Sequence, residues 1–213
     1  MNYRVVSLAV ILAASFGCGT TSTPAPAGSA SSTSSSGPSG GSAAGSASVT
    51  GKVKGAGAGA AVVLTPADGH EIAPPAAPKI MDQSGYEFLP ALLVAQQGQT
   101  VQFRNSEDVL HNVRVTEVAT ETPVFNVATI AFGSYDYKFE RPGFYTVTCD
   151  IHSTMRADIL VAPTPYTAKT DAGSGFAIDN VPAGTYILTL YAGGAPITKS
   201  VEVKSGKTEL DLP

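Results

Sequence analysis

The sequence predicts an all-β protein that follows an N-terminal export segment and a flexible tether. From Val49 onward, short runs rich in Val, Thr, Tyr and Phe recur along the chain. Turn-forming residues such as Pro142-Gly143 and Ser205-Gly206 separate these runs, and no long amphipathic helical segment stands out between them. Many short strands at this spacing are typical of β-sandwiches and β-barrels.

The pattern predicts about thirteen strands, which exceed one small sandwich and favour two domains. The segment Pro163-Thr164-Pro165 is a natural hinge, because proline fixes the backbone and cannot pair within a central strand. The expected strands cover residues 49–54, 61–65, 80–81 with 86–88, 92–94, 100–105, 111–116, 134–139, 143–149, 157–161, 175–178, 184–191, 197–203 and 208–212.

Residues 1–18 read as an export segment. A short basic stretch precedes the apolar run Val5–Phe16, which is too short to span a bilayer. Cys18 at its end resembles the acceptor cysteine of a bacterial lipoprotein, although Ser15 stands where that pattern has leucine. We therefore expect lipidation of Cys18 and a membrane anchor, with ordinary signal cleavage as the alternative.

Residues 19–47 consist almost wholly of Ser, Gly, Ala, Thr and Pro. Such a composition cannot bury enough apolar surface to offset the entropy lost on ordering, so a disordered tether is expected. A tether after a lipidated cysteine would let a folded domain reach away from the membrane. The alternative is a linker with no requirement for reach.

Cys149 is the most informative residue of the folded part. Cysteines of exported proteins usually pair, but the only other cysteine is Cys18 in the export segment. His152 follows Cys149 by three residues and Met155 follows it by six. Thiolate, imidazole and thioether are soft or borderline donors that together suit copper, and His111 upstream is the natural fourth ligand.

Two stretches of the chain resemble the cupredoxin family, and within it the plastocyanin and amicyanin group. The short Cys-x-x-His-x-x-Met loop is most similar to that of amicyanin. The first stretch contains YEFLP at 86–90, GQTVQFRN at 98–105 and HNV at 111–113, and the second runs from FERPGFYTVTC at 139–149 to the strand at 157–161.

This resemblance implies a Greek-key β-sandwich that binds one type 1 copper ion. It implies that Asn112 ties the two ligand loops together. Asp150 stands where the family usually has Ser or Thr, so the surroundings of the ligands depart from the family pattern. The implied ligands are the imidazoles of His111 and His152, the thiolate of Cys149 and, as the weak axial ligand, Met155.

The C-terminal part resembles a second family. Residues 170–178 and 181–190 are similar to carboxypeptidase regulatory-like domains, which are small transthyretin-like β-sandwiches. In that family the first two strands read like residues 49–53 and 61–64 of this chain. The family carries no catalytic residues, so this domain is expected to be a structural adaptor.

The two resemblances lead to a discontinuous domain organisation. We expect the regulatory-like sandwich to comprise residues 48–66 and 165–213, with a cupredoxin domain at 67–164 inserted between its second and third strands. The alternative assigns residues 48–164 to the cupredoxin domain and leaves 165–213 as a separate domain.

Together these features predict an exported, membrane-tethered one-electron carrier of the periplasm or cell envelope that serves redox partner proteins. The alternatives are copper delivery or sensing without electron transfer, and a structural β module with a vestigial site. An enzyme is not expected, because three histidines cannot supply the paired His-x-His motifs of a multicopper oxidase, and His70 reads as a solvated loop residue. The net charge of −4 gives no basis for nucleic-acid binding.

Overall fold

The computed structural model describes residues 46–193 and 195–213. The predicted export segment, its Cys18 and the predicted tether up to residue 45 lie outside the described residues. The described residues form strands and no helix, which confirms the predicted all-β class. They accordingly contain no helix with the length and hydropathy needed to cross a membrane.

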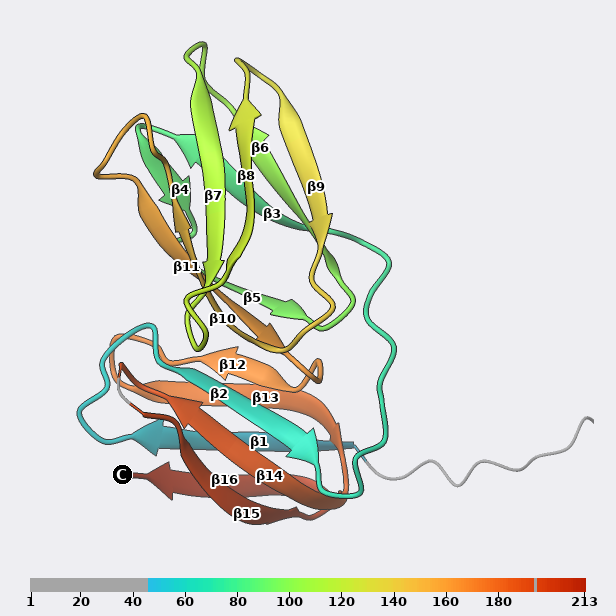
Figure 1. The fold of residues 1–213 in the computed structure, drawn as a ribbon. Coiled ribbons are helices and arrows are strands. Elements are labelled where there is room, and N and C mark those ends of the chain that lie inside the picture. The colour runs from blue at the N-terminus through green and yellow to red at the C-terminus, as the bar shows by residue number, and fades with distance from the viewer. Residues whose placement is uncertain (1–45, 194) are drawn as a thin grey trace, which may run out of the picture. The chain divides into compact units, whose positions relative to one another are not determined.

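Sixteen strands make up the described fold (Figure 1). Most of them coincide with the predicted strands to within a few residues. The first begins at Ser46, so the last two residues of the predicted tether belong to a strand. In chain order the strands are β1 (Ser46–Val53), β2 (Ala61–Pro66), β3 (Lys79–Ser84), β4 (Glu87–Leu89), β5 (Leu92–Gln96), β6 (Thr100–Asn105), β7 (His111–Glu117), β8 (Pro123–Thr129), β9 (Ser134–Lys138), β10 (Gly143–Thr148), β11 (Arg156–Ala162), β12 (Thr167–Lys169), β13 (Gly175–Pro182), β14 (Gly184–Tyr191), β15 (Ile197–Val203) and β16 (Gly206–Leu212).

Two strands, β8 and β12, were not predicted from the sequence. Each lies at the edge of its sheet and pairs with a single neighbour, β8 with β7 and β12 with β2. Strand β8 begins with Pro123, which an edge strand tolerates at its first position. Only Thr129 of β8 is fully buried, and the adjacent apolar residues Val124 and Phe125 interrupt the apolar-polar alternation that identifies a strand with one buried face.

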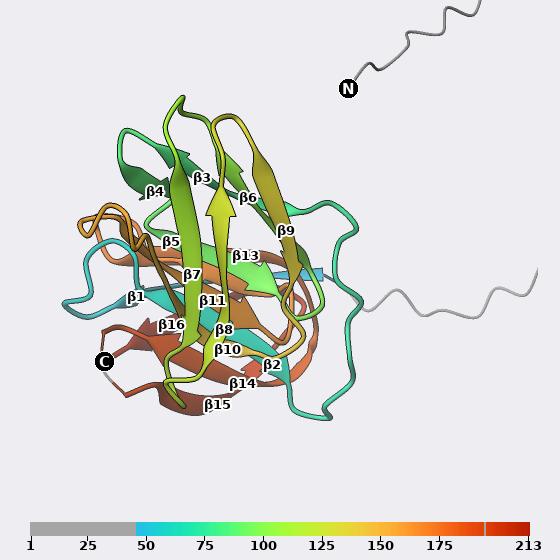
Figure 2. The ribbon, with the colours of Figure 1, turned by 45° about the horizontal axis from the view of Figure 1, so that its top comes forward.

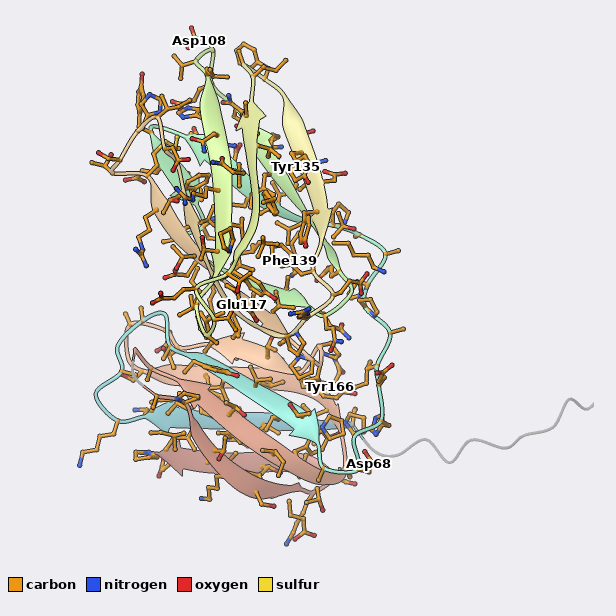
Figure 3. All side chains as sticks on the ribbon, viewed as in Figure 1. Asp68, Asp108, Glu117, Tyr135, Phe139 and Tyr166 are labelled. Atoms are coloured by element: carbon orange, nitrogen blue, oxygen red, sulfur yellow. The ribbon has the colours of Figure 1, made fainter. Side chains whose placement is uncertain are left out.

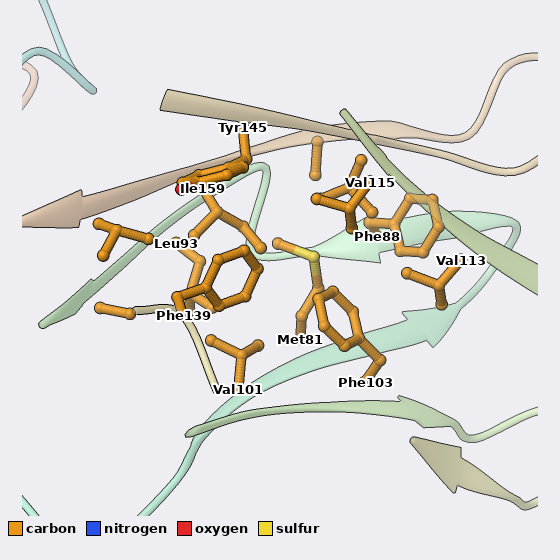
Figure 4. Packing of buried hydrophobic residues seen from close by; sticks show 14 of the residues in the cluster. Met81, Phe88, Leu93, Val101, Phe103, Val113, Val115, Phe139, Tyr145 and Ile159 are labelled. Atoms are coloured by element: carbon orange, nitrogen blue, oxygen red, sulfur yellow. The ribbon is translucent and has the colours of Figure 1, made fainter. Parts of the chain in front are cut away.

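The strands between residues 79 and 162 form two sheets around one core. Their strand orders are β5-β11-β10-β7-β8 and β4-β3-β6-β9. The β3–β6 and β5–β11 pairs are parallel, so the chain must cross between the sheets rather than run as successive hairpins. Met81 and Phe103 from one sheet pack with Val115 and Ile159 from the other, which makes this part a β-sandwich (Figure 4).

The remaining strands form two further sheets, ordered β13-β1-β16 and β12-β2-β14-β15. They share a second core that includes Val49, Leu64 and Leu188. Strands β1 and β2 thus pair only with strands that follow residue 165, although the connection at residues 67–78 leads from them to β3 (Figure 1). This is the pairing that an inserted cupredoxin-like segment requires, and the domain boundaries given above stay a prediction.

Four loops meet at one end of the sandwich that comprises β3 to β11. They are the β3–β4, β6–β7, β8–β9 and β10–β11 connections, and the tips of β6–β7 and β8–β9 lie together in both ribbon views (Figures 1 and 2). Asn105 links two of these loops, because its Nδ2 donates to the carbonyls of Val109 at 2.8 Å and Ile130 at 3.1 Å. Asp108 marks this end of β7 and Glu117 the opposite end (Figure 3).

Candidate metal centre

The structure brings three of the four predicted ligands together at the loop end of the sandwich. His111 is the first residue of β7, Cys149 follows the last residue of β10, and His152 lies in the turn before β11. The Nδ1 atoms of the two histidines are 3.0 Å apart, and the Cys149 Sγ lies 3.8 Å from the His152 Nδ1. All three donor atoms lie within 4.8 Å of one another.

This arrangement fits a single metal ion. Ligand atoms that sit about 2.0–2.3 Å from one ion are separated from each other by roughly 3–4 Å. Two of the three separations, Nδ1–Nδ1 at 3.0 Å and Cys149 Sγ to His152 Nδ1 at 3.8 Å, fall within that range, and the Cys149 Sγ and His111 Nδ1 lie within 4.8 Å of each other. Among residues 46–193 and 195–213, this trio is the one group of three or more His, Cys, Asp or Glu side chains arranged to hold an ion.

Glu107 orients His111 toward the other donors. The His111 ring is fully buried, and its Nε2 lies 2.7 Å from the Glu107 Oε2. A carboxylate at this position accepts a hydrogen bond from the Nε2–H group, which leaves the Nδ1 lone pair directed at His152 and Cys149. Burial opposes ionisation of Glu107, but hydrogen bonds from His111 and from two backbone N–H groups outweigh burial and hold the pKa of this carboxyl below its ordinary value.

Asn112 ties the start of β7 to the loop that carries Cys149. Its Oδ1 accepts hydrogen bonds from the Cys149 Sγ at 3.3 Å, the Asp150 N–H at 2.6 Å and the Ile151 N–H at 3.3 Å. The Cys149 thiol is buried and free. One side-chain oxygen therefore satisfies the thiol and two backbone groups, and this fixes the direction of the sulfur.

Asp150 is held by partners on two neighbouring strands. Its carboxylate accepts hydrogen bonds from Asn126 at 2.8 Å and from Asn112 and Arg114, each at 3.4 Å. The Asn112 Nδ2 also donates to the Asn126 Oδ1 at 2.7 Å. The hydrogen bond from Asn126 lowers the pKa of Asp150, and together with the neighbouring Arg114 it outweighs the opposing effect of burial.

Met155 closes the ligand loop. Its backbone N–H donates to the His152 carbonyl at 3.0 Å, and its carbonyl accepts the Cys149 N–H at 3.3 Å. The Met155 side chain is buried in the core of the sandwich. His70 takes no part in the cluster, since it is exposed and its ring contacts Asp68.

Sequence reasoning missed four residues that shape the site: Glu107, Arg114, Asn126 and Tyr86. The Tyr86 ring contacts the rings of both His111 and His152 in edge-to-face geometry. A signal for Glu107 was present, because an acidic residue four positions before a metal-binding histidine can bend back to its ring. Asn126 carried no such signal, since it lies on the unpredicted strand β8.

Comparison with known proteins gives partial matches. Solved structures similar to this chain include a reduced amicyanin mutant (24% identity, 42% of this chain and 91% of that chain, TM-score 0.37). They also include the Cu(I) form of another amicyanin mutant, with 24% identity over 48% of this chain and 98% of that chain and a TM-score of 0.37. A third is a novel purple cupredoxin from Nitrosopumilus maritimus, with 20% identity over 39% of this chain and 98% of that chain and a TM-score of 0.35. At TM-scores this low, the assignment of the site rests on this chain's own residues.

The other comparisons do not extend this picture. A family model for domain II of polysaccharide lyase family 4 matches residues 163–210, which does not confirm the carboxypeptidase regulatory-like resemblance. No curated protein matches the chain.

Proposed function

We propose that this protein is a type 1 copper protein that carries single electrons. The observation that carries the proposal is the convergence of the His111 Nδ1, Cys149 Sγ and His152 Nδ1 within 4.8 Å. These residues, with Met155 as the weak axial ligand, would hold one copper ion, which supplies a Cu(II)/Cu(I) couple when bound. No catalytic role is proposed.

The chain's own contacts favour a site that holds its metal rather than one that releases it. Glu107 orients His111, and Asn112 fixes Cys149 through hydrogen bonds. Ligands held in this way need little rearrangement when an electron moves, and they resist departure of the metal. Of the four proposed ligands, His111, Cys149 and Met155 are buried and only His152 is partly exposed. We therefore propose that redox partner proteins approach at His152.

We expect fast electron self-exchange and slow copper loss for the purified protein. Burial of His111 and Cys149 limits access of a chelator to the metal, whereas an electron can pass through the partly exposed His152. Self-exchange is measured by NMR line broadening in mixtures of the two oxidation states, and copper loss by transfer to a competing chelator. Rapid transfer of copper combined with slow self-exchange would instead assign the protein to copper delivery.

We also propose that the protein is exported and anchored to a membrane at the periplasmic or cell-envelope face through lipid on Cys18. The basis is the apolar segment before this cysteine. Replacing Cys18 with serine is expected to move the protein from the membrane fraction to the soluble fraction in a cell fractionation. Unchanged partitioning of the Cys18→Ser variant would overturn the anchor without affecting the copper site.

A further inference from the structure

The turn that joins β3 to β4 carries a residue that its backbone disfavours. Ser84 pairs with Glu87, so Gly85 and Tyr86 form a two-residue hairpin loop. Both have positive φ angles, 66° and 59°, as in a type I′ turn. Gly, Asn and Asp are the residues that adopt this conformation readily, and a bulky side chain there is uncommon. Some other interaction must favour tyrosine at position 86.

The Glu107 carboxylate links this turn to the candidate metal centre through hydrogen bonds. Its Oε1 accepts the Gly85 N–H at 3.0 Å, and its Oε2 accepts the Tyr86 N–H at 3.4 Å. The same Oε2 lies 2.7 Å from the Nε2 of His111. One carboxylate therefore fixes both a ligand histidine and the backbone of Tyr86, which sets the position of the tyrosine relative to that ligand.

The Tyr86 ring makes edge-to-face contacts with both proposed ligand histidines. Its centroid is 4.9 Å from that of His152 with an interplanar angle of 89°, and 5.8 Å from that of His111 with an angle of 75°. These are favourable edge-to-face geometries for aromatic rings. Tyr86 is 49% exposed, so the residue contacts the imidazoles and also faces solvent.

We propose that Tyr86 is a cover that closes the metal centre to small ligands from solvent. This inference rests on the proposed copper site. An aromatic ring packed edge-to-face against both imidazoles fills space next to a metal held between them and so limits the approach of a small anion. The cover would keep the site available to electrons, which can pass through the partly exposed His152, while excluding anions that would bind to the metal. The disfavoured turn conformation is tolerated because the Glu107 carboxylate fixes it.

Replacement of Tyr86 by glycine tests this role, because it separates a cover from a structural support. Glycine suits the positive φ, which offsets the loss of the ring contacts, so the copper-free Tyr86→Gly variant should remain folded, as circular dichroism can check. The Cu(II) form of this variant should bind azide, with a shift of its visible spectrum. Tyr86→Asn, which also tolerates the turn, gives a second variant without the ring.

Two control variants retain an aromatic ring at position 86. Tyr86→Phe retains the ring and should be as insensitive to azide as the unchanged protein. Leu89→Ala removes an exposed apolar side chain from β4 of the same hairpin and should leave the azide response unchanged. Equal azide responses in the unchanged protein and in both ringless variants would overturn the proposal, as would a response in Leu89→Ala equal to theirs.

A copper-free measurement separates this proposal from the proposed function. Diethyl pyrocarbonate acylates accessible imidazoles, and mass spectrometry reports the rate at the peptide that contains His152. Loss of the Tyr86 ring should accelerate this reaction several-fold, and Tyr86→Phe should leave the rate unchanged. No acceleration would refute the cover even if copper binds as proposed. Acceleration in a protein whose copper form lacks charge-transfer absorption would retain the cover of the histidines and reject the type 1 site.

Discussion

Replacing Cys149 with serine is expected to abolish the intense visible absorption of the copper-loaded protein while leaving the sandwich folded. The absorption arises from charge transfer between a cysteine thiolate and Cu(II), and a hydroxyl is a poor substitute for a thiolate. Serine is close to cysteine in size, so the buried position after β10 can accommodate it. Absorption and circular dichroism spectra of the two proteins at equal copper loading provide the measurement.

The control for this variant is Cys18→Ser, which removes the other cysteine of the chain. It should leave the spectrum of the copper form unchanged, because the segment that contains Cys18 is not expected to contribute to the site. Retention of the colour in Cys149→Ser would mean that the absorption does not come from this thiolate.

The second large effect is expected from Asn112→Ala. The Asn112 Oδ1 accepts the N–H groups of Asp150 and Ile151 as well as the Cys149 thiol. Removal of an acceptor from such groups costs about 1–3 kcal/mol when water does not replace it fully. Urea denaturation of the copper-free protein should therefore show a loss of that order, and the loosened loop should release copper faster to a chelator.

Asn126→Ala is the matched control for this prediction. Its side chain contacts the Asn112 Nδ2 and the Asp150 carboxylate but accepts no backbone N–H group of the ligand loop. Its removal should cost less than about 1 kcal/mol, as expected for a partly exposed polar contact. Equal losses in the two variants would show that the Asn112 oxygen has no special part in holding the ligand loop.

Most of the fold followed from local patterns in the sequence. Alternating apolar residues in β6, β7 and β10 have one face in the core, so their periodicity identified them. Strand β8 contributes only partly buried side chains, such as Phe125 and Val127, to that core, and its pairing with β7 depends on the tertiary fold. The short strand β12 also has no fully buried side chain, so no clear apolar alternation marked it in the sequence.

The site was predictable where its residues are close in sequence. Cys149, His152 and Met155 lie in one short segment, so their spacing and donor types alone indicated a metal centre, and His111 was the natural candidate for the fourth ligand. The residues that support the site, such as Tyr86 and Glu107, come from other loops. Tyr86 and Glu107 meet because β3 pairs in parallel with β6, which places the ends of both strands together. This parallel pairing cannot be deduced from the spacing of the residues along the chain.

The absorption spectrum of the unchanged protein loaded with Cu(II) tests the central claim most directly. A site built from the Cys149 thiolate and the imidazoles of His111 and His152 predicts an intense blue or green colour, together with the electron paramagnetic resonance spectrum of a type 1 centre. A colourless copper-loaded protein with an ordinary tetragonal resonance spectrum would contradict the assignment.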